Sequence, residues 1–178
     1  MKKIFLIALI GITLVACNSK PSLQEYLVEK ENSTEFISAS LPTNILFQNL
    51  DSLSSKEKSS LQKIEKINLL ALTKSKGAPI LVKERANIKT ILNQSNYEPL
   101  LNFSSGGREA RLLYAGTDSE IDELIFFGFD SEMGLLLLRM RGNDVEASDI
   151  YQITQSAQKL NMNALPGGFG NLIGNLEK

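Results

Sequence analysis

Two apolar runs in the second half of the chain constrain its fold more than any other feature. A strand in a sheet that is wet on one face alternates apolar and polar residues. Residues 124–129 and 135–138 are instead apolar at nearly every position. Both faces of these strands must therefore be covered. Helices of the same chain can bury both faces. Alternatively, one face is buried by a partner protein, by a second copy of the chain or by a bound apolar ligand.

Four apolar runs with short connectors follow Tyr97. The runs are residues 100–103, 110–115, 124–129 and 135–140. The connectors, which contain Gly, Ser or Asp, are residues 104–107, 116–119 and 130–134. Connectors this short join antiparallel neighbours. The sequence therefore predicts a four-stranded antiparallel meander.

The first half of the chain predicts helices alternating with strands. Ser22 precedes an apolar stripe at helical spacing, and Glu25 completes a capping box with it; Ser54 caps a later helix. The predicted helices are residues 23–28, 43–51, 55–65, 83–94 and, at the end of the domain, 145–160. The predicted strands are residues 35–41 and 66–73, and residues 77–79 are predicted to form a turn.

The helical spacing also predicts which side chains face the core. Inward positions are Leu61, Ile64, Ala86, Ile88, Ile91, Leu92, Ile150, Ile153, Ala157 and Leu160. Outward positions are Lys56, Glu57, Lys58 and Lys63. We therefore predict a single α+β domain over residues 23–160, an antiparallel meander sheet packed with helices, followed by a flexible Gly-rich tail over residues 161–178.

The N-terminus has the plan of a bacterial export signal. Lys2 and Lys3 precede an apolar run over residues 4–14, which is shorter than the roughly 20 residues that cross a bilayer. The run ends in Leu-Val-Ala-Cys17, which resembles the lipobox of bacterial lipoproteins. The resemblance implies that residues 1–16 are a signal peptide and that Cys17 is the lipid attachment site, bearing acyl chains such as palmitate. The alternative is an uncleaved membrane helix, for which the run stops too early.

The residues after Cys17 bear on the location of the protein. Residues 17–22 form a short lipidated tether. Asn18 lacks the carboxylate of an inner-membrane retention signal, and Lys20 is followed by Pro21 rather than by acidic residues that favour surface display. We therefore expect a membrane anchor through Cys17 at the periplasmic face of the outer membrane.

Composition excludes several kinds of chemistry. The chain has no histidine, and Cys17, its single cysteine, is expected to carry lipid. Ser-His-Asp systems, Cys-His systems and zinc sites built on imidazole or thiolate are therefore excluded. Basic and acidic residues number 19 and 20 and are interspersed, so no nucleic-acid-binding stripe is present. We expect no cofactor, no metal and no catalytic residue.

Several residue patterns resemble functional motifs, and we interpret each as structural. Asp118, Glu120, Asp122 and Glu123 lack the glycine and bidentate glutamate spacing of a calcium loop, which favours a solvated hairpin tip. The Ser-x-x-Lys motif of serine–lysine acyl transfer occurs three times without its companion motifs, at Ser55/Lys58, Ser60/Lys63 and Ser156/Lys159. The remaining patterns are the glycines Gly168, Gly170 and Gly174 in the tail and a Glu31/Glu35 pair interrupted by a helix break.

The second half of the chain resembles a known family. The matching features are Tyr97-Glu-Pro-Leu100 before the meander, the charged hairpin that follows, and a Gly-Asn-Asp step at residues 142–144 into the last helix. They are similar to the domain of unknown function numbered forty-two fifty-two, found in small secreted or lipid-anchored proteins of Gram-negative bacteria. The resemblance implies an envelope protein and supplies no catalytic residues.

Three functions remain open at this stage. The first is a non-enzymatic module that binds a partner protein of the envelope or helps to assemble a complex. The second is a carrier or sensor of an apolar ligand held between sheet and helices. The third is a hydrolase that uses carboxylates alone, which needs two carboxyl groups converging in a cleft with perturbed pKa values.

Replacement of the lipid acceptor tests the anchor. Cys17→Ser should abolish both lipid labelling and lipoprotein-specific cleavage, because the acceptor thiol is lost. Growth with labelled palmitate, followed by mass spectrometry of the mature N-terminus, measures both effects. A wild-type mature species that begins at another residue and carries no acyl mass would contradict the prediction.

Overall fold

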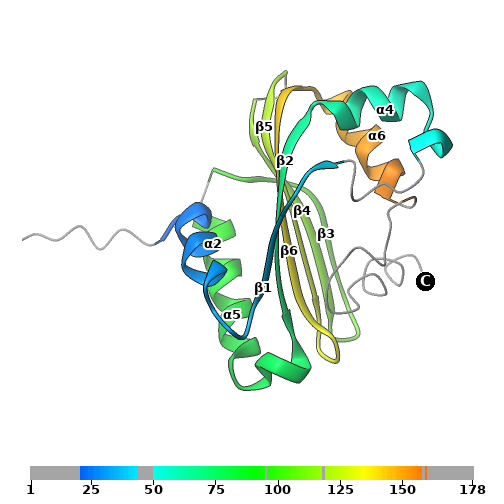
Figure 1. Cartoon of the computed structure of the whole chain (residues 1–178). Helices are drawn as coiled ribbons and strands as arrows, with labels where there is room; N and C mark the ends of the chain where they lie inside the picture. Colours follow the sequence, from blue (N-terminus) through cyan, green and yellow to red (C-terminus); the bar gives the residue numbers. More distant parts are fainter. Residues whose placement is uncertain (1–20, 44–49, 95, 118, 158, 160–178) are drawn as a thin grey trace, which may run out of the picture.

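A six-stranded antiparallel sheet with strand order β1-β2-β6-β5-β4-β3 forms the centre of the protein (Figure 1). The computed structural model describes residues 21–43, 50–94, 96–117, 119–157 and 159. The strands are β1 (Ile37–Leu41), β2 (Ile64–Thr73), β3 (Glu98–Ser105), β4 (Arg108–Gly116), β5 (Ile121–Asp130) and β6 (Gly134–Val145). The helices are α2 (Leu23–Glu31), α4 (Ser55–Gln62), α5 (Lys74–Gln94), α6 (Ala147–Ala157) and the short 3-10 helix η2 (Leu50–Ser52). This is a single α+β domain, as predicted.

The predicted meander is confirmed, and the sheet extends beyond it. Strands β3, β4, β5 and β6 are neighbours in chain order. Gly106 and Gly107 connect β3 to β4 with φ angles of 57° and 82°, which glycine adopts without strain. The two strands predicted in the first half of the chain join on the other side of β6, because β2 pairs with β6 and β1 pairs with β2.

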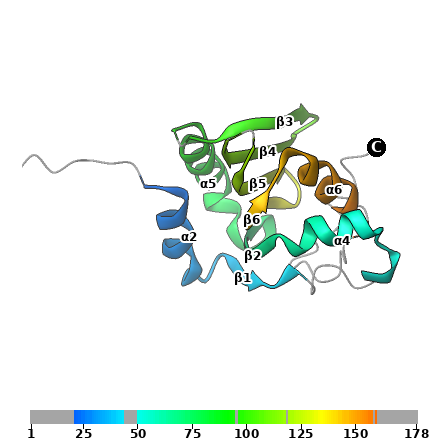
Figure 2. The same ribbon diagram turned by 90° about the horizontal axis from the view of Figure 1, so that it is seen from above.

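Helices α2 and α5 cover one face of the sheet (Figure 2). Leu70, Ile125 and Phe127 point to this face and are each 0% exposed. They share a buried cluster with Ile88 of α5 and Leu23 of α2. A fully buried side chain of this size stabilises a fold by about 1.5–3 kcal/mol through removal of apolar surface from water. This cluster is therefore a major part of the core.

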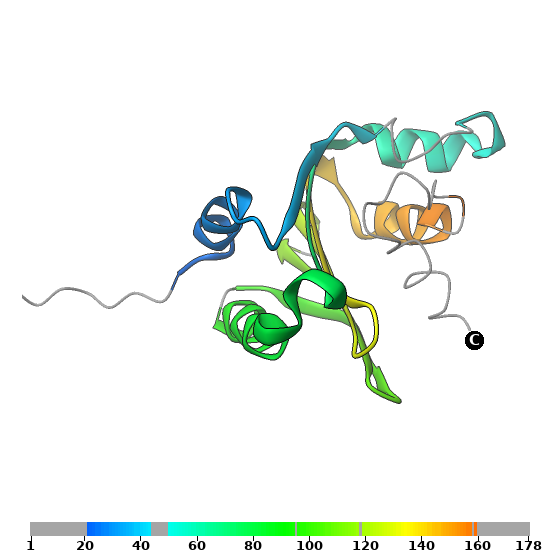
Figure 3. The same cartoon turned by 60° about the horizontal axis from the view of Figure 1, so that its bottom comes forward.

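Helices α4 and α6 pack against each other on the opposite face, toward one end of the sheet (Figures 1 and 3). Leu61 of α4 and Ile153 of α6 share a second buried cluster with Leu138 of β6. Phe126 packs against this cluster and is only partly buried. Phe126 and Phe127 thus point to opposite faces, as the alternation of a strand predicts.

Both predicted helix caps are present. The Ser22 hydroxyl accepts the backbone N–H of Glu25 at 3.2 Å, and the Glu25 carboxylate accepts the Ser22 N–H at 2.7 Å. Ser54 and Glu57 form the same reciprocal pair at 3.3 Å and 2.6 Å. Each pair satisfies two N–H groups that the start of a helix would leave without partners.

Several predicted boundaries are wrong. The first strand begins at Ile37 rather than at residue 35. Helix α4 ends at Gln62 rather than at residue 65, because the chain from Ile64 onward belongs to β2. The last helix begins at Ala147 rather than at residue 145, because Val145 pairs with Ile121 in the sheet.

The turn predicted at residues 77–79 lies inside α5. Gly77 does have non-helical angles, φ −116° and ψ 16°, and the helix kinks there. Pro79 then falls in the first turn after the kink, where a missing N–H removes no hydrogen bond. The helical element therefore begins at Lys74, nine residues earlier than the predicted start at residue 83.

Two predicted side-chain orientations are wrong. Glu57 was expected to face solvent, but it is 6% exposed. Ala86 was expected to face the core, but it is exposed, and Glu84 is buried at 4% exposed. Helical spacing alone places apolar residues inside, and it misses an acid that has a buried partner.

Some predictions fall outside the described residues. These are the signal peptide, Cys17 and the tether as far as residue 20, most of the helix at residues 43–51, and the tail at residues 161–178. Among the described helices, none is both long and apolar enough to span a membrane.

The two adjacent phenylalanines give a test of the layers. Phe127→Ala should lower the free energy of unfolding by about 3–5 kcal/mol, because a fully buried ring leaves a cavity. Phe126→Ala should lower it by clearly less, since that ring is only partly buried. Guanidinium unfolding of a chain without its signal peptide and Cys17 measures both values, and equal losses would contradict the assignment of the two faces.

Candidate functional site

Asp149 bridges the serine and the lysine of the Ser60/Lys63 motif. The Ser60 hydroxyl donates to Asp149 Oδ1 at 2.6 Å, and Lys63 Nζ lies 2.6 Å from Asp149 Oδ2. Burial alone would raise the pKa of Asp149, but bonds from Lys63, Ser60 and the Glu146 N–H outweigh burial and lower it. The bond to Asp149 also raises the pKa of Lys63. A lysine that activates serine needs a depressed pKa, so this geometry favours a structural role, in which Asp149 joins α6 to the C-terminal end of α4.

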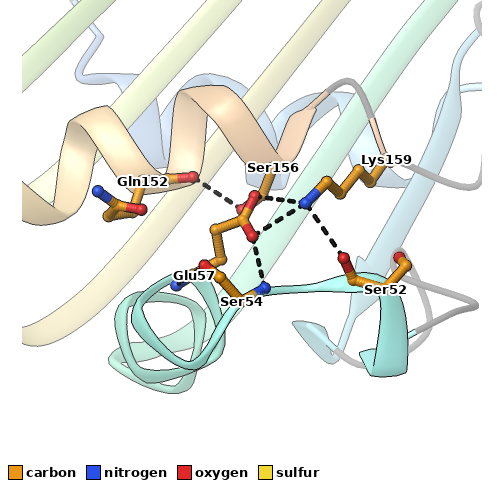
Figure 4. Close-up of polar contacts among 6 residues, drawn as sticks. All are labelled: Ser52, Ser54, Glu57, Gln152, Ser156 and Lys159. Carbon is orange, nitrogen blue, oxygen red and sulfur yellow. Dashed lines mark hydrogen bonds and ion pairs between the residues drawn. The ribbon is translucent and has the colours of Figure 1, made fainter.

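The residues of the Ser156/Lys159 motif are likewise bound to other groups (Figure 4). Ser156 is 0% exposed, and its hydroxyl donates to the carbonyl oxygen of Gln152 at 2.7 Å. Lys159 Nζ lies 2.9 Å from each carboxylate oxygen of Glu57 and 3.2 Å from the carbonyl oxygen of Ser52. The geometry again ties two helices together.

The Glu57 carboxylate is held in its charged form. The hydrogen bond from Lys159 and those from the backbone and side chain of Ser54 lower the pKa of Glu57 to about 2. In the third motif, Lys58 forms an exposed ion pair of 3.8 Å with Asp51. In each of the three motifs the lysine is therefore paired with a carboxylate.

The acidic segment between β4 and β5 is only partly a solvated tip. Glu120 and Asp122 are exposed, as predicted, and Asp118 lies outside the described residues. The prediction that Glu123 also belongs to the solvated tip is wrong. Glu123 lies within β5 and accepts hydrogen bonds from Arg139 and from the Tyr97 hydroxyl. Within the described part of the chain, no three His, Cys, Asp or Glu side chains are placed to hold a metal ion.

Among the further buried carboxylates that escaped the sequence analysis are Glu84 and Glu109. Glu84 accepts the Tyr26 hydroxyl at 2.8 Å and lies 3.4 Å from Lys30 Nζ. Glu109 lies 2.7 Å from Arg85 Nη2 and 2.9 Å from Lys89 Nζ. Burial alone would raise the pKa of Glu109, but Lys89 and Arg85 together lower it.

One of these acids, Glu84, had a weak signal in the sequence. Glu84 precedes Ile88 by four residues, on the stripe that α5 buries.

Glu31 and Glu35, the remaining acidic pair, do not share a helix, as predicted, since α2 ends at Glu31. The glycines Gly168, Gly170 and Gly174 lie outside the described residues.

Strand β3 carries several exposed apolar side chains at the edge of the described sheet. All eight residues of β3 are exposed. Leu100, Leu101 and Phe103 are 44%, 49% and 39% exposed, and they are three of the six large apolar side chains exposed among the described residues. Among the described residues only β4 pairs with β3, so no described strand lies on the other side of β3 (Figure 2). We call residues 101–105 the β3 edge.

A hollow of about 340 Å³ adjoins the β3 edge and α5. Its lining is Lys89, Asn93, Asn102, Phe103, Ser104, Glu109 and Arg111. Arg111 Nε donates to the side-chain oxygen of Asn102 at 3.1 Å, and Nη1 donates to that of Asn93 at 3.0 Å. We call this feature the Arg111 hollow. The β3 edge and the Arg111 hollow together form the candidate site.

A family model described as Domain of unknown function (DUF4252) matches residues 28–153. The chain belongs to this family. The match confirms the resemblance seen in the sequence, and it spans every strand of the sheet from β1 to β6. No curated protein and no solved structure matches the chain.

The DUF4252 domain thus uses its buried charges to join elements. Glu57 and Asp149 connect α4 with α6 and its C-terminal end, and Glu84 connects α5 with α2. Glu109 connects β4 with α5. Each of these four acids has its own cation.

The lowered pKa of Glu57 predicts a pH effect on stability. A carboxyl whose folded pKa lies below its unfolded value stabilises the fold above the unfolded pKa and loses that effect as pH falls toward the folded pKa. Thermal stability should therefore fall between about pH 4.5 and about pH 2, and Glu57→Gln should flatten that fall. Circular dichroism melts across this range measure it. Asp51→Asn, which changes an exposed acid on the neighbouring turn, is the control; a Glu57→Gln profile parallel to wild type would contradict the assignment.

Proposed function

We propose that this protein is a lipid-anchored, non-enzymatic module of the cell envelope that binds a partner protein through the β3 edge. In this proposal acyl chains on Cys17 hold the domain at the periplasmic face of the outer membrane. The tether from Cys17 to the cap Ser22 spans at most roughly 18 Å when extended, so the domain works close to the membrane surface.

The observation that carries the proposal is that the β3 edge lacks the features that usually prevent an edge strand from pairing with another chain. In natural sheets, charged residues, proline or bulges in the edge strands prevent unwanted pairing with other chains. Pro99 and a bulge lie at the start of β3, whereas residues 101–105 have no charged residue and no proline. The opposite edge strand, β1, is shorter, and its residues are partly buried at alternate positions. An exposed, uncharged apolar edge favours addition of a strand from another protein.

The other two functions have less support. A carboxylate hydrolase needs an acid with a raised pKa, whereas the pKa values of Glu57, Glu109 and Asp149 are all lowered. A carrier of apolar ligands needs an apolar cavity, whereas the Arg111 hollow and a second one beside α2 are lined mainly by polar and charged side chains. We therefore favour protein binding.

Photo-crosslinking in intact cells tests the proposal. A photoreactive amino acid at Asn102 of the full-length, membrane-bound protein should form a discrete adduct with one envelope protein. The same amino acid at Val82, which is 76% exposed on α5, is the matched control and should not form this adduct.

A second variant links the adduct to the edge. Ser104→Pro removes a backbone N–H from the β3 edge and should abolish the Asn102 adduct while the domain keeps its circular dichroism spectrum. An adduct that forms equally from Val82, or no adduct from Asn102, would contradict binding at this edge.

A further inference from the structure

The hairpin geometry shows which backbone groups of β3 point outward. In a two-residue hairpin the residues that flank the turn form a hydrogen-bonded pair, and bonded and non-bonded pairs then alternate. Ser105 and Arg108 flank Gly106 and Gly107. The non-bonded positions are therefore Ser104 and Asn102, whose N–H and C=O groups point away from β4. A strand added to the sheet would bond to these two residues.

The side chains of the same two residues lie on the face of the Arg111 hollow. Asn102 pairs with Arg111 and Ser104 pairs with Glu109 across the β3–β4 ladder, and paired side chains share a face. The bond from Arg111 Nε to Asn102 brings the guanidinium over β3, toward the free edge. A residue of the added strand opposite Asn102 would project its side chain over the hollow.

The hollow carries more positive than negative charge. Arg85 and Lys89 share the single carboxylate of Glu109. Arg111 donates to the neutral amide oxygens of Asn93 and Asn102, and none of the described carboxylates forms an ion pair with it. Amide partners orient a guanidinium without cancelling its charge. A carboxylate that enters the hollow would gain a charge-assisted hydrogen bond from a group already in place.

The other face of the β3 edge is apolar. Phe103, which also borders the Arg111 hollow, pairs with Ala110, and Leu101 pairs with Leu112. Leu112 pairs in turn with Phe126 of β5, so an apolar surface continues into the sheet. Side chains of an added strand alternate between the faces, so every second residue would contact this surface.

A second copy of the chain is a poorer occupant than another protein. Two β3 strands paired antiparallel about Asn102, whose N–H and C=O groups point outward, would bring the two Arg111 hollows together at the two-fold axis. Facing cations disfavour such a pair.

We propose that the segment bound at β3 is an extended acidic strand of the partner, with a carboxylate side chain in the Arg111 hollow and apolar side chains against Leu101 and Phe103. This inference rests on the proposed function, because it specifies the chemistry of the partner that the β3 edge binds. The bound strand alternates acidic and apolar residues.

Synthetic peptides test the alternation. The probes are two short fluorescent peptides in which Val alternates with Glu or with Lys, titrated against the full-length chain in a non-ionic detergent. The Glu peptide should bind about tenfold more tightly than the Lys peptide, as expected for one charge-assisted hydrogen bond. Arg111→Gln should remove this preference. Arg141→Gln makes the same charge change on the exposed part of β6, away from β3, and should leave the preference intact.

The outcomes separate this inference from the proposed function. Equal binding of both peptides, lost in Ser104→Pro, would overturn the acidic preference and leave strand addition at β3 standing. The preference for the Glu peptide could persist in Ser104→Pro, or after alternate peptide nitrogens are methylated. Either result would show that the charge binds without strand pairing and would overturn the inference. Failure of both peptides to bind would also overturn it, and crosslinking at Asn102 then decides the proposed function independently. A concentration-dependent dimer that Ser104→Pro abolishes would identify a second copy as the occupant and overturn it as well.

Discussion

Burial of both faces of β6 and β5 is the constraint on which the rest of the structure depends. The four leucines of β6 at residues 135–138 alternate between the two core clusters, and none is more than 7% exposed. Such a strand is stable only between two other strands and between two layers of helices. Strands β2 and β5 supply the neighbours, α2 and α5 cover one face, and α4 and α6 pack on the other. The arrangement of the helices on the two faces of the sheet meets this demand for cover.

The buried charges serve the same architecture. An acid at the border of an apolar layer is stable when a cation or hydroxyl satisfies it. Glu84 and Glu109 have such partners between the sheet and its α2–α5 layer, and Arg85 also lies over the Phe129 ring at 4.2 Å. Glu57 and Asp149 do the same between α4 and α6. These bonds fix where each helix lies, so the titratable groups that most resemble catalytic residues are occupied by structural partners.

The described sheet ends at β3, and this is the edge at which we propose that a partner strand binds. The sheet is buried at its centre and exposed along its last strand, and the two faces of that strand differ in chemistry. One face continues the apolar surface from Phe103 and Leu101, while the other borders the charge of Arg111 and Lys89. A binding edge with two unlike faces selects the orientation and the register of a strand, because a one-residue slip exchanges the faces.

The sequence by itself determined the local structure and the need for cover. Ser22 and Ser54 start their helices through contacts within one turn, the order of the meander follows from short connectors, and the apolar runs require two covered faces. The lipid anchor at Cys17 also stays a prediction from sequence alone. Only the tertiary structure decided the contacts between distant residues. Glu57 is buried because Lys159 reaches it from a point 102 residues later in the chain, and Arg111 is oriented by amides that α5 and β3 contribute separately. The physical reason is that periodicity reports which face of an element is buried, whereas the partner of a buried charge depends on which elements the sheet brings together.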